Sequence, residues 1–564
     1  LLDWDLFQLL NIENVPKGID WTLTTDYLSR RGPAIGSRID YELPGNYGPR
    51  SGPNGFLDVW GISDGGLDTL GPTRRDLTPE KDFRGYVYGR HQQIVRPGLQ
   101  FMAEVGLVSD RTFLEQYFES AWDQQKDYDT SLLLRQSVGN HQFEVAAELN
   151  ANEFHTDTNK LPAAKHTGFG SDIGWLNWNT VNEVGYAQID TAETPLIPAL
   201  ASRFTTLPGN GNVDGVVASS RHELSLPIDT RLGTLIPYVQ GSVDFFGEDL
   251  SGNQQTRLLG AAGIRSALPM VSTKPSVQSP LLNLTGLTHK LVFTNDIYYA
   301  DASENFDTLP LYDALDDDAQ EEHRRRLAFD LYGGGTIPTF YDPRLFAIRQ
   351  GLQRSLSNPS PQLAEDMLII NPGIRQRWQT KRGLPGNERV VDLARLDVSA
   401  MLHPDSTDIN FGETVGPVNY EFTYNFGDRL AFESQGYFDF FDGGLRSVSA
   451  GLRGSRPGSA DAYLGLLSIE GPISSTALRA SVDYRVSRKY WVNAASTFDF
   501  GDVGNVGSSV GFTRIGEAFV FGLRLSVDEG RDNASIGFQF SPRILPRRAL
   551  GGVRIAPPGL FGLE

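Results

Sequence analysis

The feature that most constrains the fold is a period-two alternation of apolar and polar residues in the last quarter of the chain. It runs almost without interruption from Gly416 to Phe540, as in the segments Leu478 to Val486 and Phe519 to Val527. Each run has the length that a tilted strand needs to cross a bilayer, and each ends at Gly, Asp, Asn or Pro. The pattern therefore predicts a series of antiparallel hairpins.

Two architectures can use such strands. In a soluble β-sandwich the apolar face is covered by a second sheet, whereas in a membrane barrel it meets lipid and the polar face lines a wet lumen. The opposite face of most strands here is charged, which a water-filled interior tolerates and a sandwich core does not. Aromatic residues gather toward strand ends, as in the interfacial girdles of barrels, at Phe438, Phe440, Tyr490, Phe498 and Phe500. We favour the barrel, with a soluble all-β protein as the alternative.

The chain has 564 residues, and no linker interrupts the strand rhythm between Trp21 and Phe540. At about 10 residues per strand and a similar number per connection, it holds on the order of 20 to 26 strands. The long polar segments Pro44 to Asn54 and Asp64 to Asp82 are expected as loops on one side of the barrel. We therefore predict an all-β fold, with a large antiparallel transmembrane β-barrel over residues 1–541 and a C-terminal tail over residues 542–564.

Composition narrows the function. The chain has no cysteine, which excludes disulfides and thiolate metal sites, and its formal net charge of -19 argues against nucleic-acid binding. Local basic stretches remain at Arg324 to Arg326, Arg375 to Arg382 and Arg543 to Arg548, and such stretches are more often solvated loop charge. The chain begins at Leu1 without an initiator Met, which is typical of a mature or trimmed segment.

The sequence gives no support for catalysis, a metal or a cofactor. Gly507 to Gly511 matches G-x-S-x-G, but this motif needs a strand-to-helix turn and here it lies in an alternating run. His155 and His166 are expected in separate loops, at the surface rather than as metal ligands. The acidic residues Asp316 to Asp318 have no partner that would position a substrate. We expect a protein that is not an enzyme.

Four segments of the chain carry short sequence motifs, in an order that is also found in a known family. Ser109 to Phe118 reads SDRTFLEQYF and is interpreted as a helical turn within a loop, capped by Ser109 or Asp110. Trp21 to Gly32 reads WTLTTDYLSRRG, and Arg221 to Tyr238 reads RHELSLPIDTRLGTLIPY. His289 to Asp313 is a long strand that ends in LPLYD.

Together these segments resemble the LptD family of lipopolysaccharide-assembly outer-membrane proteins, also called organic solvent tolerance proteins. The residues that match the family's motif are Asp110, Arg111, Phe113, Leu114, Tyr117 and Phe118. The better-known members carry a periplasmic domain before the barrel and cysteines that tie the two together, whereas this chain has no cysteine. An Arg-rich stretch of the family is replaced by Asp316 to Arg326, which we expect to be a solvated loop or short helix.

The resemblance implies a place in the outer membrane of the Gram-negative type and a role in transport. Lipopolysaccharide would enter the lumen from a periplasmic bridge similar to LptA and leave sideways through a seam into the outer leaflet. The partners implied are lipopolysaccharide, outer-membrane lipids, that bridge, a plug lipoprotein similar to LptE and the barrel assembly machinery. The alternative is a porin-like solute channel or uptake barrel, and a third hypothesis is a secreted sugar-binding β-protein.

A barrel closes by pairing its first and last strands, here expected at Leu2 to Ile12 and Asn533 to Ser541. Pro16 and Pro542 lie just beyond these strands and would shorten the seam, although they are also explained as ordinary turn prolines. The residues expected at the seam are Trp4, Leu6, Gln8, Pro16, Ile536, Phe538, Phe540 and Pro542. The residues expected to line the lumen are Asp26, Arg38, Asp40, Glu42, Glu421, Glu433, Arg479, Asp483 and Arg485.

Overall fold

The fold is a single large antiparallel sheet. The computed structural model describes residues 2–48, 51–71, 74–205, 207, 209–282, 284–333, 338–384, 386–405, 409–471, 474–501, 504–529 and 533–542. Its 26 strands belong to one sheet, in which strands that follow one another in the chain pair antiparallel. The predicted all-β barrel is confirmed, at the upper end of the predicted strand number.

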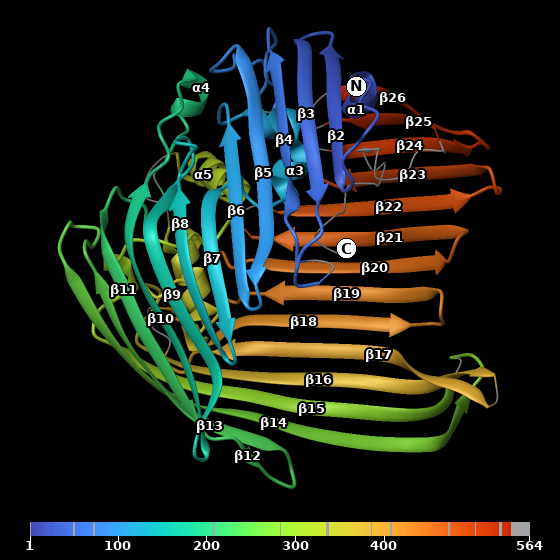
Figure 1. The fold of residues 1–564 in the computed structure, drawn as a ribbon. Helices are drawn as coiled ribbons and strands as arrows, with labels where there is room; N and C mark the ends of the chain where they lie inside the picture. Colours follow the sequence, from blue (N-terminus) through green and yellow to red (C-terminus); the bar gives the residue numbers. More distant parts are fainter. Residues whose placement is uncertain are drawn as a thin grey trace.

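The strands divide into two walls that face each other (Figure 1). The first wall contains β1 (Leu2–Asp5), β2 (Ile19–Leu28), β3 (Gly32–Glu42), β4 (Asn54–Ser63), β5 (Phe83–Arg96), β6 (Leu99–Val108), β7 (Thr130–Val138), β8 (His141–Leu149), β9 (Asp157–Ile173), β10 (Leu176–Asp190) and β11 (Asp214–Ser225). The two-residue β12 (Ile228–Asp229) continues the line of β11 along β13 (Thr234–Phe246).

The second wall is built from the rest of the chain. It contains β14 (Gln255–Ser279), β15 (Leu284–Ala302), β16 (Met367–Leu384), β17 (Asn387–Leu402), β18 (Val415–Asn425), β19 (Leu430–Phe438), β20 (Arg446–Arg456), β21 (Ala460–Glu470), β22 (Ser475–Arg485), β23 (Tyr490–Asp499), β24 (Asn505–Ile515), β25 (Phe519–Asp528) and β26 (Asn533–Pro542). The segment Gly507–Gly511 lies inside β24, in a strand as expected.

Alternation along each strand separates an apolar outer face from a polar inner face. In β22 the side chains of Val482 and Tyr484 are exposed on the outside, while Asp483 between them points to the other face. β26 repeats the pattern with Ile536 and Phe538, both largely exposed. Large apolar side chains exposed in rows along consecutive strands form the surface that a membrane barrel presents to lipid.

The two ends of the barrel differ. At one end, which we call the short-turn end, connections such as residues 97–98 and 174–175 are tight. Gly98 lies in one of them with φ +77°, and a Cβ there would approach the carbonyl oxygen of Ser137 to 2.6 Å. The other end, the long-loop end, carries connections such as residues 191–213 and 303–366. The loop Asp64 to Asp82 lies at the long-loop end, whereas Pro44 to Asn54 joins β3 to β4 at the short-turn end, so the prediction that both lie on one side was wrong.

The helices are short and almost all belong to loops at the long-loop end. They are α1 (Leu6–Leu9), α2 (Phe113–Tyr117), α3 (Glu119–Gln124), α4 (Pro198–Ala201), α5 (Asp318–Tyr332) and α6 (Pro343–Arg349), with 3-10 turns η1 (Phe306–Thr308), η2 (Thr339–Tyr341) and η3 (Leu352–Arg354). No helix among the described residues is long and apolar enough to cross a membrane. α5 and α6 lie in the 303–366 loop and appear between the two walls in Figure 1.

The buried apolar core lies where the 303–366 loop meets the inner face of the sheet. Ile348 of α6 and Leu363 pack against Tyr238, Tyr298 and Ile369, which come from the inner faces of β13, β15 and β16. A second cluster joins α2 and α3 to the wall. Because this apolar contact is confined to the long-loop end, the loops close that end from within.

Three local expectations were wrong. β1 ends at Asp5, whose side chain accepts a hydrogen bond from the Gln8 backbone and caps α1, so Leu2 to Ile12 is not one strand. The segment Asp316 to Arg326 was expected to be a solvated loop or short helix; the helix is confirmed as α5, which begins at Asp318, but Arg325 is buried and not solvated. α2 begins after Thr112, because the Asp110 carboxylate binds Arg84 and does not cap the helix.

The two faces of β22 give a testable contrast. An Arg on the lipid face near the bilayer centre costs about 2–4 kcal/mol, so Val482→Arg should destabilise the barrel by that order. Asp483→Arg, on the inner face opposite Asp461 of β21, should cost far less. Reversible unfolding in lipid vesicles measures both, and equal penalties would mean that the faces are assigned wrongly.

Candidate functional site

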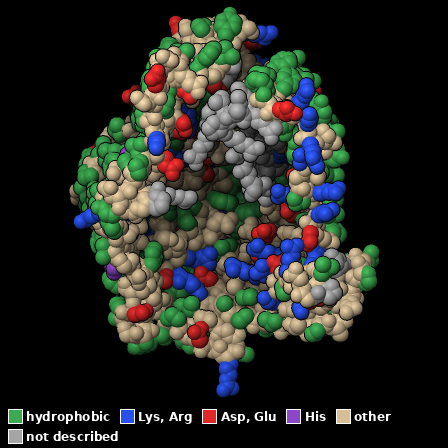
Figure 2. All heavy atoms as spheres, turned by 45° about the vertical axis from the view of Figure 1, so that its right-hand side comes forward, with side chains coloured by type: hydrophobic (Ala, Val, Ile, Leu, Met, Phe, Trp, Pro, Cys, Tyr) green, Lys and Arg blue, Asp and Glu red, His purple; other side chains and the backbone are tan. Residues whose placement is uncertain are grey.

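The candidate site is the hollow interior of the barrel. Figure 2 shows the molecule hollowed between its lateral walls, with charged side chains inside the opening. A cavity of about 1400 Å³ lies against β2 to β5, and four of the predicted lumen residues line it: Asp26, Arg38, Asp40 and Glu42. The structure thus brings together four residues that the sequence placed on two separate strands.

Hydrogen bonds fix the side chains along this wall. Arg38 Nε donates to Asp40 at 2.8 Å and its terminal nitrogen to Asp58 at 3.0 Å. Asp26 accepts from the indole N–H of Trp60 at 3.0 Å. These carboxylates outnumber the single guanidinium, so the wall formed by β2 to β5 is acidic.

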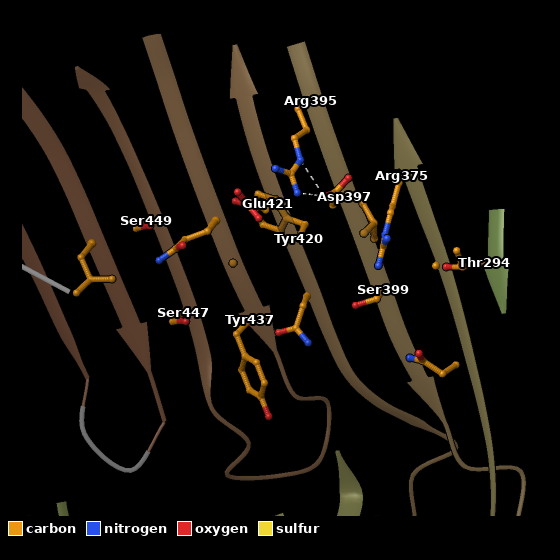
Figure 3. A pocket seen from close by; sticks show the side chains of 17 residues that line it. Thr294, Arg375, Arg395, Asp397, Ser399, Tyr420, Glu421, Tyr437, Ser447 and Ser449 are labelled. Carbon is orange, nitrogen blue, oxygen red and sulfur yellow. Dashed lines mark hydrogen bonds and ion pairs between the residues drawn. The ribbon is translucent and has the colours of Figure 1, made fainter. Parts of the chain in front are cut away.

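A second cavity of about 700 Å³ lies on the inner wall from β15 to β21 and includes the predicted lumen residue Glu421 (Figure 3). Its charged lining also contains Arg375 of β16 with Arg395 and Asp397 of β17. Arg395 Nε donates to Asp397 at 2.9 Å. The rest of the lining is rich in hydroxyl and amide groups, such as Ser449, which can hydrogen-bond a polar solute.

Glu433 and Arg479 share one row of the sheet. Their register places Gly451 and Gly465 between them, and the ring of Tyr463 occupies the space above both glycines. A Cβ at Gly465 would come within 2.2 Å of the Tyr463 hydroxyl, so glycine is needed there.

The last two predicted lumen residues lie near the end of β22. Asp483 faces Asp461 on the neighbouring strand. Arg485 donates to the carbonyls of Gly458 and Ser487 at 3.3 and 3.2 Å, so its guanidinium binds two turns at the short-turn end.

A third cavity, of about 1010 Å³, was not predicted and is strongly acidic. The backbone N–H of Asp318 donates to both carboxylate oxygens of Asp127 at 3.2 and 3.3 Å. Burial raises the pKa of Asp127 to about 7, and burial together with the charge of Asp127 raises the pKa of Asp318 well above its ordinary value. No sequence pattern links two loop residues so far apart in the chain.

His155 lies beside this acidic pair and was wrongly expected at the surface. Its ring stacks on Trp122 at 5.5 Å, and Nε2 is 3.7 Å from a carboxylate oxygen of Asp318. Burial, with a smaller effect of the cations Arg111 and Arg325, lowers the pKa of His155 to about 3. The imidazole is therefore neutral at physiological pH. No group of three or more His, Asp or Glu among the described residues is arranged to hold a metal ion.

Buried arginines attach the 303–366 loop to the wall. Arg221 of β11 donates to the carbonyl of Asn358 at 2.5 Å. Arg257 of β14 is fully buried, donates to the carbonyl of Gln362 at 2.7 Å and pairs with Asp244 at 3.1 Å. Guanidinium groups can satisfy several acceptors at once, which suits them to hold an irregular backbone inside a barrel.

The same loop has a further anchor at Arg349, the last residue of α6. Its guanidinium pairs with both carboxylate oxygens of Asp439 at 2.9 and 2.7 Å and donates to Asn410 at 3.0 and 2.7 Å. The rings of Phe411 and Phe441 lie 4.8 and 4.9 Å from it. The arrangement joins α6 to two further loops at the long-loop end.

The motif residues belong to a buried network of hydrogen bonds and ion pairs at the long-loop end. Arg84 of β5 pairs with Asp110 at 2.9 and 2.8 Å and with Asp68 at 2.8 Å. Phe113 and Leu114 are buried, and Tyr117 donates to Asp64 at 2.6 Å. The remaining motif residues contact neighbours as well: Arg111 reaches Glu322 of α5 at 3.0 Å, and Phe118 packs on Trp60 and Tyr86.

The predicted seam residues lie on two elements that end the sheet. Trp4 is in β1, opposite Leu23 of β2, whereas Leu6 and Gln8 lie in α1 and Pro16 in the connection to β2. Among the described residues, β1 pairs only with β2.

The other edge is β26. Ile536, Phe538 and Phe540 are on its exposed outer face, and Pro542 is the last residue of β26, opposite Phe519, so it does not lie beyond the strand. Among the described residues β26 pairs only with β25. An even number of antiparallel steps separates β1 from β26, so the two run in the same direction and cannot form an antiparallel ladder with each other. The predicted tail beyond Pro542 lies outside the described residues.

Comparison with known protein families gives one match. Residues 82–336 match the LptD family, LPS transport system D. The resemblance predicted from the sequence motifs is therefore confirmed. Three of the four motif-bearing segments fall within or largely within the matched residues. No curated protein sequence matches the chain.

Solved structures with a similar fold are distant. The siderophore receptor PirA from Pseudomonas aeruginosa is 9% identical, with 94% of this chain and 81% of that chain covered and a TM-score of 0.36. The P pilus usher (PapC) translocation pore is 8% identical, with 93% and 98% covered and a TM-score of 0.28. A mutant of the Rh. blastica porin is 10% identical, with 59% and 93% covered and a TM-score of 0.21.

The Arg349 anchor predicts a large effect of one substitution. Arg349→Met leaves Asp439 buried without its cation, and breaking a buried ion pair in this way costs about 3–5 kcal/mol. Arg203→Met is the matched control, because Arg203 forms only a half-exposed 3.7 Å pair with Asp330 and should cost at most about 1 kcal/mol. Denaturant unfolding in detergent, with protease sensitivity of the 303–366 loop, reports both. Equal effects would refute the anchor.

The contact between Asp127 and Asp318 predicts a dependence on pH. The pKa of Asp127 is raised from 3.8 to about 7 in the folded protein, so its stabilising contribution is present below pH 3.8 and is lost as pH rises through about 7. Hydrogen exchange of α5, corrected for intrinsic rates, should show less protection at pH 8 than at pH 5. Asp127→Asn should weaken this dependence, whereas Asp330→Asn, on the exposed side of α5, should not. An unchanged profile in Asp127→Asn would contradict the assignment.

Proposed function

We propose that this protein is an outer-membrane translocon that inserts lipopolysaccharide into the outer leaflet of a Gram-negative envelope. The observation that carries the proposal is the match of residues 82–336 to LPS transport system D, a family of transport proteins and not of enzymes. A polar interior with three sizeable cavities supports it, because a sugar-phosphate head group needs a wet path through the membrane.

The route we propose begins at the short-turn end and leaves sideways. The 303–366 loop fills the long-loop end, so a bulky solute that enters from the opposite end has no straight exit. β1 and β26 share no hydrogen-bonded ladder among the described residues, and parting them therefore breaks no ladder bonds. Unpaired edges are costly in lipid, so such an opening would be held narrow or covered between transport events.

The proposal extends to domains and partners. Residues 1–541 act as one barrel domain, with the tail after it. A periplasmic bridge similar to LptA delivers the lipid at the short-turn end, a plug lipoprotein similar to LptE occupies part of the wide lumen, and the barrel assembly machinery inserts the protein. The seam residues named above border the exit, and the inner-face charges line the path.

Depletion of the protein in its native cell tests the proposal. We expect loss of surface lipopolysaccharide, its accumulation inside the cell, and no reduction in uptake of small hydrophilic solutes. Complementation with the unaltered chain should restore the surface lipid, while complementation with Arg349→Met should restore less than Arg203→Met does. Normal surface lipid with reduced solute uptake would instead identify a porin-like channel.

A further inference from the structure

The inner wall formed by β15, β16 and β17 carries a row of cations. Lys290 of β15 lies directly opposite Arg377 of β16, which lies directly opposite Arg395 of β17. Arg375 is two residues from Arg377 on the same face, one step toward the long-loop end. Four basic side chains thus project from three adjacent strands into the lumen, where Arg375 and Arg395 line the 700 Å³ cavity (Figure 3).

Two of these cations form ion pairs, Arg375 forms none, and Lys290 interacts with Asp392 through its charge without forming an ion pair. Arg377 pairs with Asp392 at 2.6 Å, and Arg395 pairs with Asp397. The side chains of Lys290 and Arg375 are exposed and form no hydrogen bond or ion pair with any residue that the structure describes. Like charges placed directly opposite each other in a sheet destabilise it, so sheet stability does not explain the row.

The row stands out against the remainder of the lumen. The cavity against β2 to β5 sets several carboxylates, including Asp20, Asp40 and Asp58, against one arginine. The 1010 Å³ cavity is lined by more carboxylates still, among them Asp127 and Asp157. A chain with a net charge of -19 therefore concentrates unpaired positive charge on one stretch of its inner wall.

We propose that the Lys290, Arg375, Arg377 and Arg395 row, with the adjoining 700 Å³ cavity, is a binding site for a phosphate-bearing saccharide. The inference rests on the proposed function, since it names the part of the transported lipid that this wall would hold. It also predicts that the phosphate lies against this stretch of the lumen, because the carboxylates that line the other two cavities would repel it.

The chemistry of the cavity fits both parts of such a ligand. A guanidinium presents its N–H groups in a planar fork that matches two phosphate oxygens, and the Lys290 ammonium adds a mobile point charge. Beside the cations lie side chains that pair well with sugar hydroxyls, including Asn419, Gln435 and Ser449. Tyr437 adds an aromatic ring at the cavity edge. A free anion would use only the cations, whereas a phosphosaccharide would use both sets.

Binding by the purified full chain in detergent micelles tests the site. The probes are a glucosamine disaccharide with two phosphates, the same disaccharide without phosphate, and inorganic phosphate, each titrated calorimetrically. The double variant Lys290→Gln/Arg375→Gln should weaken binding of the phosphorylated disaccharide by about tenfold or more and reduce its salt dependence. Neither side chain forms a hydrogen bond or ion pair with the described residues, and Lys290 has only a charge interaction with Asp392, so the barrel should fold, which resistance to unfolding on a gel checks.

Two single variants sharpen the result. Arg375→Lys keeps the charge and loses the fork, so it should give an intermediate affinity. Arg453→Gln is the control: Arg453 of β20 is likewise exposed on the inner face and without an ion pair among the described residues, and its loss should leave binding unchanged.

The outcomes separate this site from the proposed function. Equal binding of the two disaccharides, equal affinity for inorganic phosphate, or an equal loss in Arg453→Gln would overturn the site. Each can occur while depletion still abolishes surface lipopolysaccharide, in which case only the site is wrong. If depletion leaves the surface lipid normal and the double variant still loses the phosphorylated disaccharide, the site stands as one for phosphosaccharides and the translocon does not.

Discussion

Backbone hydrogen bonding is the constraint on which the rest of this structure depends. In hydrocarbon each unpaired N–H or C=O costs several kcal/mol, so a spanning chain must pair each strand with neighbours on both sides. The ladders that join the strands from β2 to β25 meet that demand. Because each strand then has one face toward lipid and one toward the lumen, its residues alternate between apolar and polar. Among the described residues β1 and β26, at the two edges of the sheet, each pair on one side only, as does the two-residue β12.

Features set by local sequence could be predicted, and features set by distant contacts could not. The alternation around Val482 gave the faces of β22 and the strand character of residues 478–486, because each residue's side follows from its neighbour's. Asp26 and Arg38 could be placed on an inner face for the same reason. α1 could not be predicted, because Asp5 also fits a polar position of a strand. Only the structure shows that its carboxylate caps a helix.

The loops illustrate the limit more strongly. Arg349 and Asp439 meet because α6 folds back over the inner face of the sheet. The sequence around either residue does not indicate that it contacts the other. The basic stretch Arg375 to Arg382 was visible in the sequence but resembled solvated loop charge. In the structure this stretch is part of β16, where Arg375 and Arg377 face the lumen. Arg382 is instead buried and donates to the carbonyl of Asn425. The net charge and composition of the chain could not show which of these arginines face the lumen and which is buried.

The attachment of the 303–366 loop has a consequence for how that end of the barrel responds to its surroundings. Its arginine anchors at Arg257 and Arg349 are buried ion pairs, which salt screens much less than exposed ones. Its contact through Asp127 and Asp318 loosens gradually as protons leave. Alkaline conditions would therefore weaken the attachment at the start of α5, whereas α6 stays attached through Arg349.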